Sequence, residues 1–192
     1  MKKIIGTLVL FICLSSIGYC QFTKGRFMAG GSLSATSSSY NYNDGSATSK
    51  SNSVSFYPQV GYFMINNFAA GVGLSLSRSH YKAPSASPTG DVSSNSINFS
   101  PFARYYIHKF FGQATFERGT SKTKTEGTSG SPYHLKNTGW SLSAGYAFLL
   151  NNHVAIEPQV GYGINYVDTS AGNNTTNGNL FLKAGIQVYI GR

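Results

Sequence analysis

The sequence predicts an all-β protein, an eight-stranded antiparallel up-and-down transmembrane β-barrel. A strand–turn–strand unit recurs, because Pro-Gln-Val-Gly-Tyr occurs at 58–62 and 158–162 and a looser Pro-Phe-Ala-Arg-Tyr at 101–105. Apolar and polar residues alternate with period two in each unit, which is the pattern of a strand with two unlike faces. Charged residues make up only 11% of the chain, which suits a β-surface that faces lipid rather than water.

The N-terminal segment has the features of an export signal. Lys2 and Lys3 precede an apolar run at 4–14, which has the length of a signal-peptide core and is too short for a membrane-spanning helix. We therefore expect a signal peptide at 1–20, cleaved after Cys20. One alternative is a lipoprotein acylated on Cys20, which the bulky Tyr19 disfavours. Another is a buried N-terminal strand.

The expected mature chain, 21–192, is long enough for one domain. Both cysteines, Cys13 and Cys20, lie in the removed segment, so no disulfide is expected. Loss of Lys2 and Lys3 lowers the net charge from +9 to +7. Such a balance permits contact with anionic lipid or nucleic acid. The basic residues are spread along the chain without interleaved aromatic residues, so we expect no nucleic-acid binding.

The first half of the chain contains four alternating segments. In the second of them Val60 lies on the apolar face and Gln59 on the other. The pair Asn66-Asn67 forms a short turn, because asparagine tolerates the positive φ that two-residue hairpin turns require. Polar stretches at 38–51 and 81–93 are expected loops. The four segments cover 26–37, 53–65, 68–77 and 97–107.

The second half repeats this scheme. His108-Lys109 and Asn151-Asn152 are the expected short turns, and 122–134 and 168–177 are the expected polar loops. Glycines within the strands, such as Gly71 and Gly73, are expected to relieve crowding in a narrow barrel. The four segments cover 110–121, 140–148, 154–165 and 180–190.

Short and long connections alternate along the chain. Strict up-and-down order then places every long loop at one end of the barrel and both termini at the other, as in transmembrane β-barrels with short periplasmic turns. Lipid cannot satisfy the backbone of an open sheet edge, so the sheet must close, with its apolar set facing lipid. Aromatic residues near the strand ends fit two interfacial girdles: Tyr62, Tyr105, Tyr146 and Phe148 at the short turns, Trp140 and Tyr166 at the other end.

These features resemble the small outer-membrane barrels of the OmpA/OmpX type and, more closely, the outer-membrane β-barrel domain proteins of Bacteroidetes-like bacteria. The likeness is carried by the signal ending before Gln21, the repeated motifs, including the Gly-Tyr…Asn-Asn units at 61–67 and 145–152, and the final strand. It implies the outer membrane of a Gram-negative bacterium after signal-peptide removal. The implied partners are outer-membrane lipid, the barrel assembly machinery and extracellular ligands at the loops. One departure is the ending Tyr189-Ile190-Gly191-Arg192, where such barrels often end on an aromatic residue.

Candidate chemistry is sparse. The histidines His80, His108, His134 and His153 show no metal-ligand spacing on one strand. The chain has no Gly-x-Ser-x-Gly nucleophile motif. Each long loop carries a single acidic residue: Asp44, Asp91, Glu126 or Asp168. We therefore expect no enzymatic activity, no metal and no cofactor.

The candidate functional residues face the expected lumen. An eight-stranded barrel leaves an interior that side chains just fill, so opposite charges there should pair. Arg104–Glu117 and Glu157–Lys183 are candidate pairs on neighbouring strands, and Arg104–Glu157 across the lumen is the alternative. We interpret the set as a stabilising plug, with a proton or ion path as the alternative. It comprises Arg104, Glu117, Glu157, Lys183, Gln59, Gln113, Gln159 and Gln187.

Two functions follow from this pattern. The first is a structural or surface-interaction protein with polar loops, which the charged lumen favours. The second is a transporter of small hydrophobic molecules of the OmpW type, with a lateral exit through the wall. A soluble lipocalin-like barrel is a third reading, and it requires apolar residues inside and polar residues outside.

Overall fold

The computed structural model describes residues 22–41, 48–83, 90–125, 133–168 and 174–191. The expected signal peptide at 1–20, its cleavage site, and the loop acids Asp44 and Glu126 lie outside these ranges. Within them, no helix is long and apolar enough to cross a bilayer.

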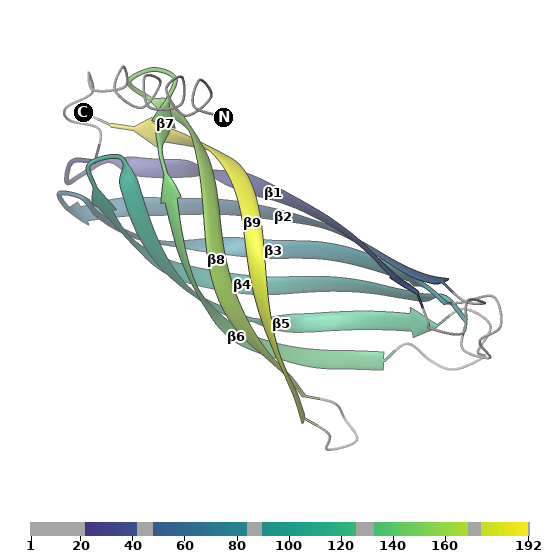
Figure 1. Ribbon diagram of the computed structural model, residues 1–192. Coiled ribbons are helices and arrows are strands. Elements are labelled where there is room, and N and C mark those ends of the chain that lie inside the picture. The colour runs from purple at the N-terminus through teal and green to yellow at the C-terminus, as the bar shows by residue number, and fades with distance from the viewer. Residues whose placement is uncertain (1–21, 42–47, 84–89, 126–132, 169–173, 192) are drawn as a thin grey trace, which may run out of the picture.

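The described chain forms a closed antiparallel barrel (Figure 1). Each strand pairs with its neighbours in the chain, β1 pairs with β9, and β6 pairs with β8, which closes the ring. β6 and β7 are two parts of one strand interrupted at Ala147, so the barrel has the eight strands that the alternation predicts. The bounds are β1 (Phe27–Asn41), β2 (Thr48–Ile65), β3 (Phe68–Lys82), β4 (Val92–Ile107), β5 (Phe110–Thr125), β6 (Tyr133–Tyr146), β7 (Phe148–Leu149), β8 (Val154–Asp168) and β9 (Asn174–Ile190).

The strands are longer than the sequence pattern predicts, and the expected loop bounds are wrong. β1 and β2 run into the polar stretch 38–51, and the other three long loops are shortened in the same way. These polar segments lack apolar alternation. Their backbone groups still form strand pairs, because they continue the register of the apolar part of each strand. Polar side chains also bond across the strands: Ser37 donates to Asn52 at 2.7 Å, and Ser121 to Ser96 at 2.9 Å.

The apolar face of the sheet points outward. Val60 is 55% exposed and Ile186 58%, whereas Ser75, on the opposite face, is 3% exposed. The barrel therefore presents an apolar outer surface, and the lipocalin-like arrangement is wrong. Outward apolar side chains include Leu33, Val54, Val60, Val72, Leu142, Leu182 and Ile186.

Aromatic side chains ring the outer surface at the short-turn end. The rings of Phe27 and Tyr62, which face each other across β1 and β2, lie 4.9 Å apart. Those of Phe110 and Tyr146, across β5 and β6, lie 4.8 Å apart, and Phe148 lies 4.6 Å from Tyr146. This arrangement matches the interfacial girdle of membrane barrels at the short-turn end, where the sequence predicts it. The predicted place of Trp140 in a second girdle is wrong, because Trp140 lies in the middle of β6.

The short turns are stabilised in different ways. Asn67 adopts a φ of 66° and His108 a φ of 58°, both in the left-handed region. Asn151 acts through its side chain, whose Oδ1 accepts hydrogen bonds from the backbone N–H of His153 at 2.7 Å and Val154 at 2.9 Å. The two Asn-Asn pairs in the sequence therefore close their hairpins in physically different ways.

One glycine in β3 shows why the lumen requires small residues. A Cβ on Gly71 would lie 2.6 Å from Cα of Gly61 and 2.8 Å from the ring of Phe102. No side chain fits at that distance, so glycine at this position lets the wall and the interior pack closely.

Gaps in the strand pairing occur at three outward-facing prolines, Pro58, Pro101 and Pro158. Between β4 and β5 the paired residues run to Phe99↔Arg118 and resume at Phe102↔Thr115, with Pro101 in the gap. The same gap occurs at Pro58 between β2 and β3. Proline has no N–H to donate, so each gap is a local weakness in the wall.

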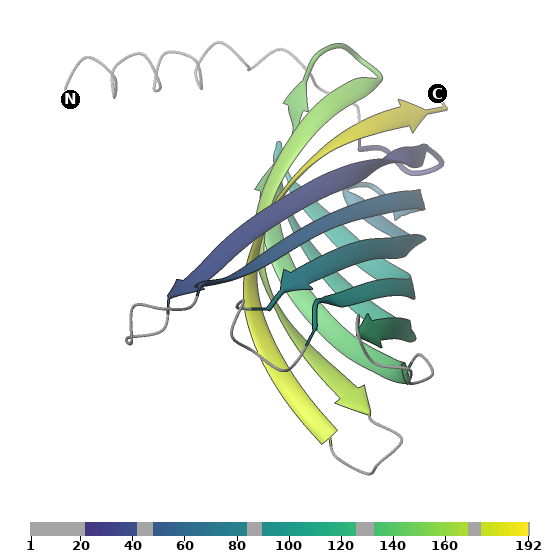
Figure 2. The ribbon, with the colours of Figure 1, turned by 90° about the vertical axis from the view of Figure 1, so that its right-hand side faces the viewer.

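The junction between the first and last strands is short. β1 pairs with β9 over seven residues, from Phe27↔Ile190 to Leu33↔Ala184. β1 and β2, and likewise β8 and β9, pair over fifteen. Figure 2 shows β1 and β9 separating toward the loop end.

Candidate functional site in the barrel lumen

The charged lumen residues lie at two heights. Arg104 is three residues from the short-turn end of β4, and Glu157 three residues from that of β8. Glu117 and Lys183 each lie seven residues from the short-turn ends of β5 and β9. Equal distances along equally tilted strands give similar heights, so these four residues form two layers.

The Arg104 layer consists of Arg104, Tyr106, Gln113, Glu157 and Tyr189. Arg104 Nη1 lies 2.5 Å from Glu157 Oε2, and the two side chains are 0% and 2% exposed. Arg104 Nε donates to Gln113 Oε1 at 2.7 Å, and Nη1 donates to the Tyr106 hydroxyl at 2.9 Å. A buried ion pair of this kind requires further hydrogen bonds to both partners. Here Nε and Nη1 of Arg104 are bonded, whereas its buried Nη2 has no partner among the described residues.

Two tyrosines complete the contacts of the carboxylate. The Tyr189 hydroxyl donates to Glu157 Oε1, and the Tyr106 hydroxyl lies 3.2 Å from the same oxygen. The two hydroxyls are 3.1 Å apart. Arg104 also lies over the ring of Phe111, 4.2 Å from its centroid, so the cation is held on one side by charge and on another by an aromatic face.

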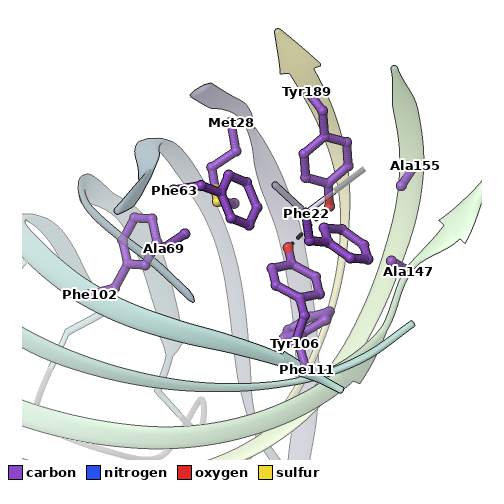
Figure 3. Packing of buried hydrophobic residues seen from close by; sticks show 10 residues of the cluster. All are labelled: Phe22, Met28, Phe63, Ala69, Phe102, Tyr106, Phe111, Ala147, Ala155 and Tyr189. Atoms are coloured by element: carbon purple, nitrogen blue, oxygen red, sulfur yellow. Dashed lines mark hydrogen bonds between the residues drawn. The ribbon is translucent and has the colours of Figure 1, made fainter. Parts of the chain in front are cut away.

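An aromatic cluster closes the short-turn mouth directly beside this layer (Figure 3). Phe22 stacks on Tyr106 at 3.9 Å, lies edge-on to Tyr189 at 5.4 Å, and is 6.1 Å from Phe63. Its carbonyl accepts a hydrogen bond from the N–H of Asn67 at 2.7 Å. The segment before β1 thus seats a phenyl ring in the mouth of the barrel.

The Lys183 layer consists of Tyr57, Glu117, Phe181 and Lys183. Lys183 Nζ lies 3.7 Å from the ring centroid of Tyr57 and 4.3 Å from that of Phe181. Glu117 and Lys183 line the same cavity of about 80 Å³, with Asn165 and Asn179 toward the loops. This volume has room for a few water molecules, so we expect the Lys183 layer to be hydrated, whereas the Arg104–Glu157 pair is sealed from solvent.

The structure places all the predicted lumen residues inside the barrel. Arg104 pairs with Glu157 across the lumen, which is the alternative pairing, and not with Glu117, because Glu117 lies four residues higher. Lys183 shares its cavity with Glu117, and Glu157 pairs with Arg104, so the predicted Glu157–Lys183 pair is also wrong. Gln59 lines a second cavity of about 30 Å³, Gln159 accepts from Ser143 at 3.2 Å, and Gln187 is 1% exposed.

Sequence reasoning missed Phe22, Tyr106 and Tyr189 as members of the site. Tyr106 and Tyr189 were detectable, because both fall on the polar face of their strands, where a tyrosine needs a hydrogen-bond partner. Phe22 precedes the first strand and has no periodic pattern around it.

A closed eight-stranded barrel with an apolar outside, an aromatic girdle and a polar lumen is an outer-membrane β-barrel protein. A family model described as the autotransporter β-domain matches residues 59–188. The chain belongs to that family.

Three solved structures are similar to this chain, and the first of them shows the same fold. The outer-membrane protein OprG from Pseudomonas aeruginosa aligns with a TM-score of 0.52 at 10% identity, over 88% of this chain and 98% of that one. Neisserial surface protein A aligns with a TM-score of 0.46 at 20% identity, over 86% and 97%. The translocator domain of autotransporter NalP from Neisseria meningitidis aligns with a TM-score of 0.47 at 15% identity, over 96% and 69%. No curated protein matches the sequence.

Proposed function

We propose that this protein is a closed barrel with a structural or surface-interaction role, in which side chains fill the lumen and polar loops meet the exterior. The observation that carries the proposal is the Arg104 layer. A dry, hydrogen-bonded ion pair spans the lumen, and Phe22 covers it on the short-turn side.

We further propose that the barrel is of the OmpA/OmpX type and resides in the outer membrane of a Gram-negative bacterium after removal of residues 1–20. It is surrounded by outer-membrane lipid, inserted by the barrel assembly machinery, and meets extracellular ligands at its loops. We propose no enzymatic activity, cofactor or nucleic-acid partner.

A role in moving a polypeptide through the lumen, which the family name suggests, is not part of the proposal. Such passage would require displacement of both Phe22 and the Arg104–Glu157 pair. An interior of eight strands has room for side chains and not for a peptide in addition.

Single-channel conductance in planar bilayers tests the closed lumen. We expect no stable, porin-like steps from the parent protein, and openings in Glu157→Ala or Arg104→Ala. Glu117→Ala is the matched control, because it removes a lumen carboxylate without touching the Arg104 layer. Large, stable steps from the parent protein contradict the proposal.

Export is tested separately by intact mass. The mature protein purified from membranes should begin at Gln21 and should therefore lack Cys20 and any lipid attached to it. A mass that includes residues before Gln21, or an acylated Cys20, contradicts the signal-peptide assignment and leaves the closed lumen untouched.

Transport of small hydrophobic molecules is a second candidate, favoured by one observation. The pairing gap at Pro101 lies beside an apolar groove on the outer surface of β4, β5 and β6. A lateral exit through the wall would need such a weak point. The polar lumen at the height of Glu117 and Lys183 argues against this candidate, because an apolar molecule would have to pass it.

Replacement of Pro101 distinguishes the two candidates. Pro101→Val supplies the missing N–H donor, and Ala144→Val, on the outward face of β6 and outside the groove, is the control. If the wall opens for transport, Pro101→Val lowers uptake of an apolar fluorescent probe by cells and Ala144→Val does not. A closed structural barrel gives the same uptake in all three.

A further inference from the structure

The outer surface of β3 to β6 carries a cluster of cations at the loop-side edge of the apolar band, where Arg118 pairs with the exposed Phe99 and the others lie nearer the loops. We call Arg78, Arg118, Lys122 and Lys136 the basic patch, and all four side chains are exposed. Arg78 pairs with Asn95, and Asn95 pairs with Lys122, so these three lie in one row across β3, β4 and β5. Paired residues point to the same face of a sheet, so all three face the surroundings of the barrel.

The row lies directly above apolar residues. Leu76 and Ile97, which pair with each other, are each two residues closer to the membrane centre than Arg78 and Asn95. Thr120 continues this lower row on β5, and Lys136 on β6 pairs with Thr120. Arg118, Lys122 and Lys136 therefore surround Thr120, with Arg118 and Lys122 about 14 Å apart along β5.

Few carboxylates lie near the cations of the basic patch. Among the residues that the structure describes, no carboxylate lies within 4 Å of Arg78, Arg118 or Lys122, while Asp91 lies beside His80. Asp168 is the register partner of Lys136 and reduces the charge at that corner. Lys50, Lys82 and Lys124 add further exposed cations toward the loops.

The charge is confined to one side of the barrel. The sequences of β8, β9 and β1 contain a single Lys or Arg, Lys183, which faces the lumen. Their outward faces carry apolar residues such as Leu33, Leu180 and Leu182. General attraction to an anionic membrane would not require this asymmetry, whereas a site for one ligand would.

The same wall contains an apolar groove of about 360 Å³ directly below the patch. The small side chains of Ala103 and Ala114 form its floor between larger neighbours, and Phe116 lies two residues below Arg118. Its apolar lining also includes Pro101, Trp140 and Leu142.

We propose that this wall binds a phosphorylated lipid of the outer leaflet, with phosphate groups on Arg78, Arg118 and Lys122 and an acyl chain in the groove. Arginine and lysine bind phosphate through charge-assisted hydrogen bonds, and a basic surface beside an apolar one matches an anionic amphiphile. The long-loop end then lies at the outer leaflet, as in the proposed function, but binding in detergent micelles does not depend on that orientation.

The test is native mass spectrometry of the full protein in nonionic detergent. The probes are diphosphorylated lipid A, its dephosphorylated form and a phosphatidylcholine. We expect a stoichiometric adduct with the diphosphorylated lipid alone. Arg118→Gln/Lys122→Gln should weaken it about 25-fold, since each charge near the surface contributes about fivefold.

The matched control is Lys24→Gln/Lys109→Gln, which removes the same charge at the short-turn end and should change affinity less than about twofold. Ala114→Phe fills the groove and should weaken binding with the patch intact. The single variants Arg118→Gln and Lys122→Gln replace the double variant if it does not fold.

Three results overturn the proposal. One is equal weakening by the two double variants. Another is equal binding of the phosphorylated and dephosphorylated lipids. The third is displacement of the lipid by millimolar inorganic phosphate, which would identify free phosphate as the ligand.

Discussion

The two ends of the barrel differ in where their charged side chains lie. At the short-turn end the cation is inside, where Arg104 and Glu157 are sealed from water, and the outer surface is aromatic. Toward the loops the lumen has cavities, and the cations on the outer surface form the basic patch. The same residue types therefore have different roles according to their height on a strand.

This difference shows what governs a small barrel. In the lumen, burial of a charged side chain depends on its distance from the sealed mouth. Arg104 is close to Phe22 and the tyrosines and must be neutralised by a carboxylate. Lys183 is farther from the mouth and rests on two aromatic faces beside water-sized cavities.

The largest effect should come from breaking the ion pair. Glu157→Ala leaves Arg104 buried without its counter-ion, and should lower the free energy of unfolding by about 3–5 kcal/mol. Glu117→Ala, in the hydrated layer, should lower it by much less. Urea unfolding in lipid vesicles measures both, and equal losses would contradict the contrast between the two layers.

The outer surface offers a matched pair on β2. Val60→Arg places a charge near the middle of the apolar band and should destabilise the barrel by about 2–4 kcal/mol. Asn52→Arg is on the same face, eight residues nearer the loops, and should change stability by about 0–1 kcal/mol. If the two variants have the same free energy of unfolding, the position assigned to the apolar band along β2 is wrong.

The seal at the mouth is tested by Phe22→Ala. Loss of the buried ring should lower the free energy of unfolding by about 1.5–3 kcal/mol. The half-buried Phe181, in the hydrated layer, is the control, and Phe181→Ala should have a smaller effect. An unchanged midpoint for Phe22→Ala in the same vesicle assay would show that the mouth does not depend on this ring.

The smallest effect concerns the turn between β4 and β5. His108 has a φ of 58°, where most side chains are strained by about 1–2 kcal/mol and glycine is not. His108→Gly should raise stability by up to about 1 kcal/mol, because the added chain freedom of glycine offsets part of the relief. Lys109→Gly, at the adjacent position without positive φ, should lower stability instead.

Much of the fold was predictable because alternation and turn chemistry are local properties. Val60 and Ile186 alternate with polar neighbours, and this period alone predicts their outward orientation. The ends of the strands were not predictable in this way, since the serine-rich ends of β1 and β2 pair through their backbones and have no apolar pattern.

The Arg104–Glu157 pair was predictable as an alternative, because the heights of the charged residues can be counted from the short turns. Residue counts from the short turns place Arg104 level with Glu157, and Glu117 level with Lys183. Phe22 differs, because its position is set by tertiary contacts with Tyr106, Tyr189 and Phe63, and no local pattern encodes them.

The short junction between β1 and β9 has a mechanical consequence. A closed sheet under tension opens at the strand pair with the fewest hydrogen bonds. β1 and β9 share seven residue pairs, whereas β1 and β2 share fifteen, as do β8 and β9. The chain ends adjoin the junction of β1 and β9, so a pull on either end acts directly on the weakest link. Under a mechanical load, β1 and β9 should therefore separate first. The barrel then opens into a curved sheet before any hairpin comes apart.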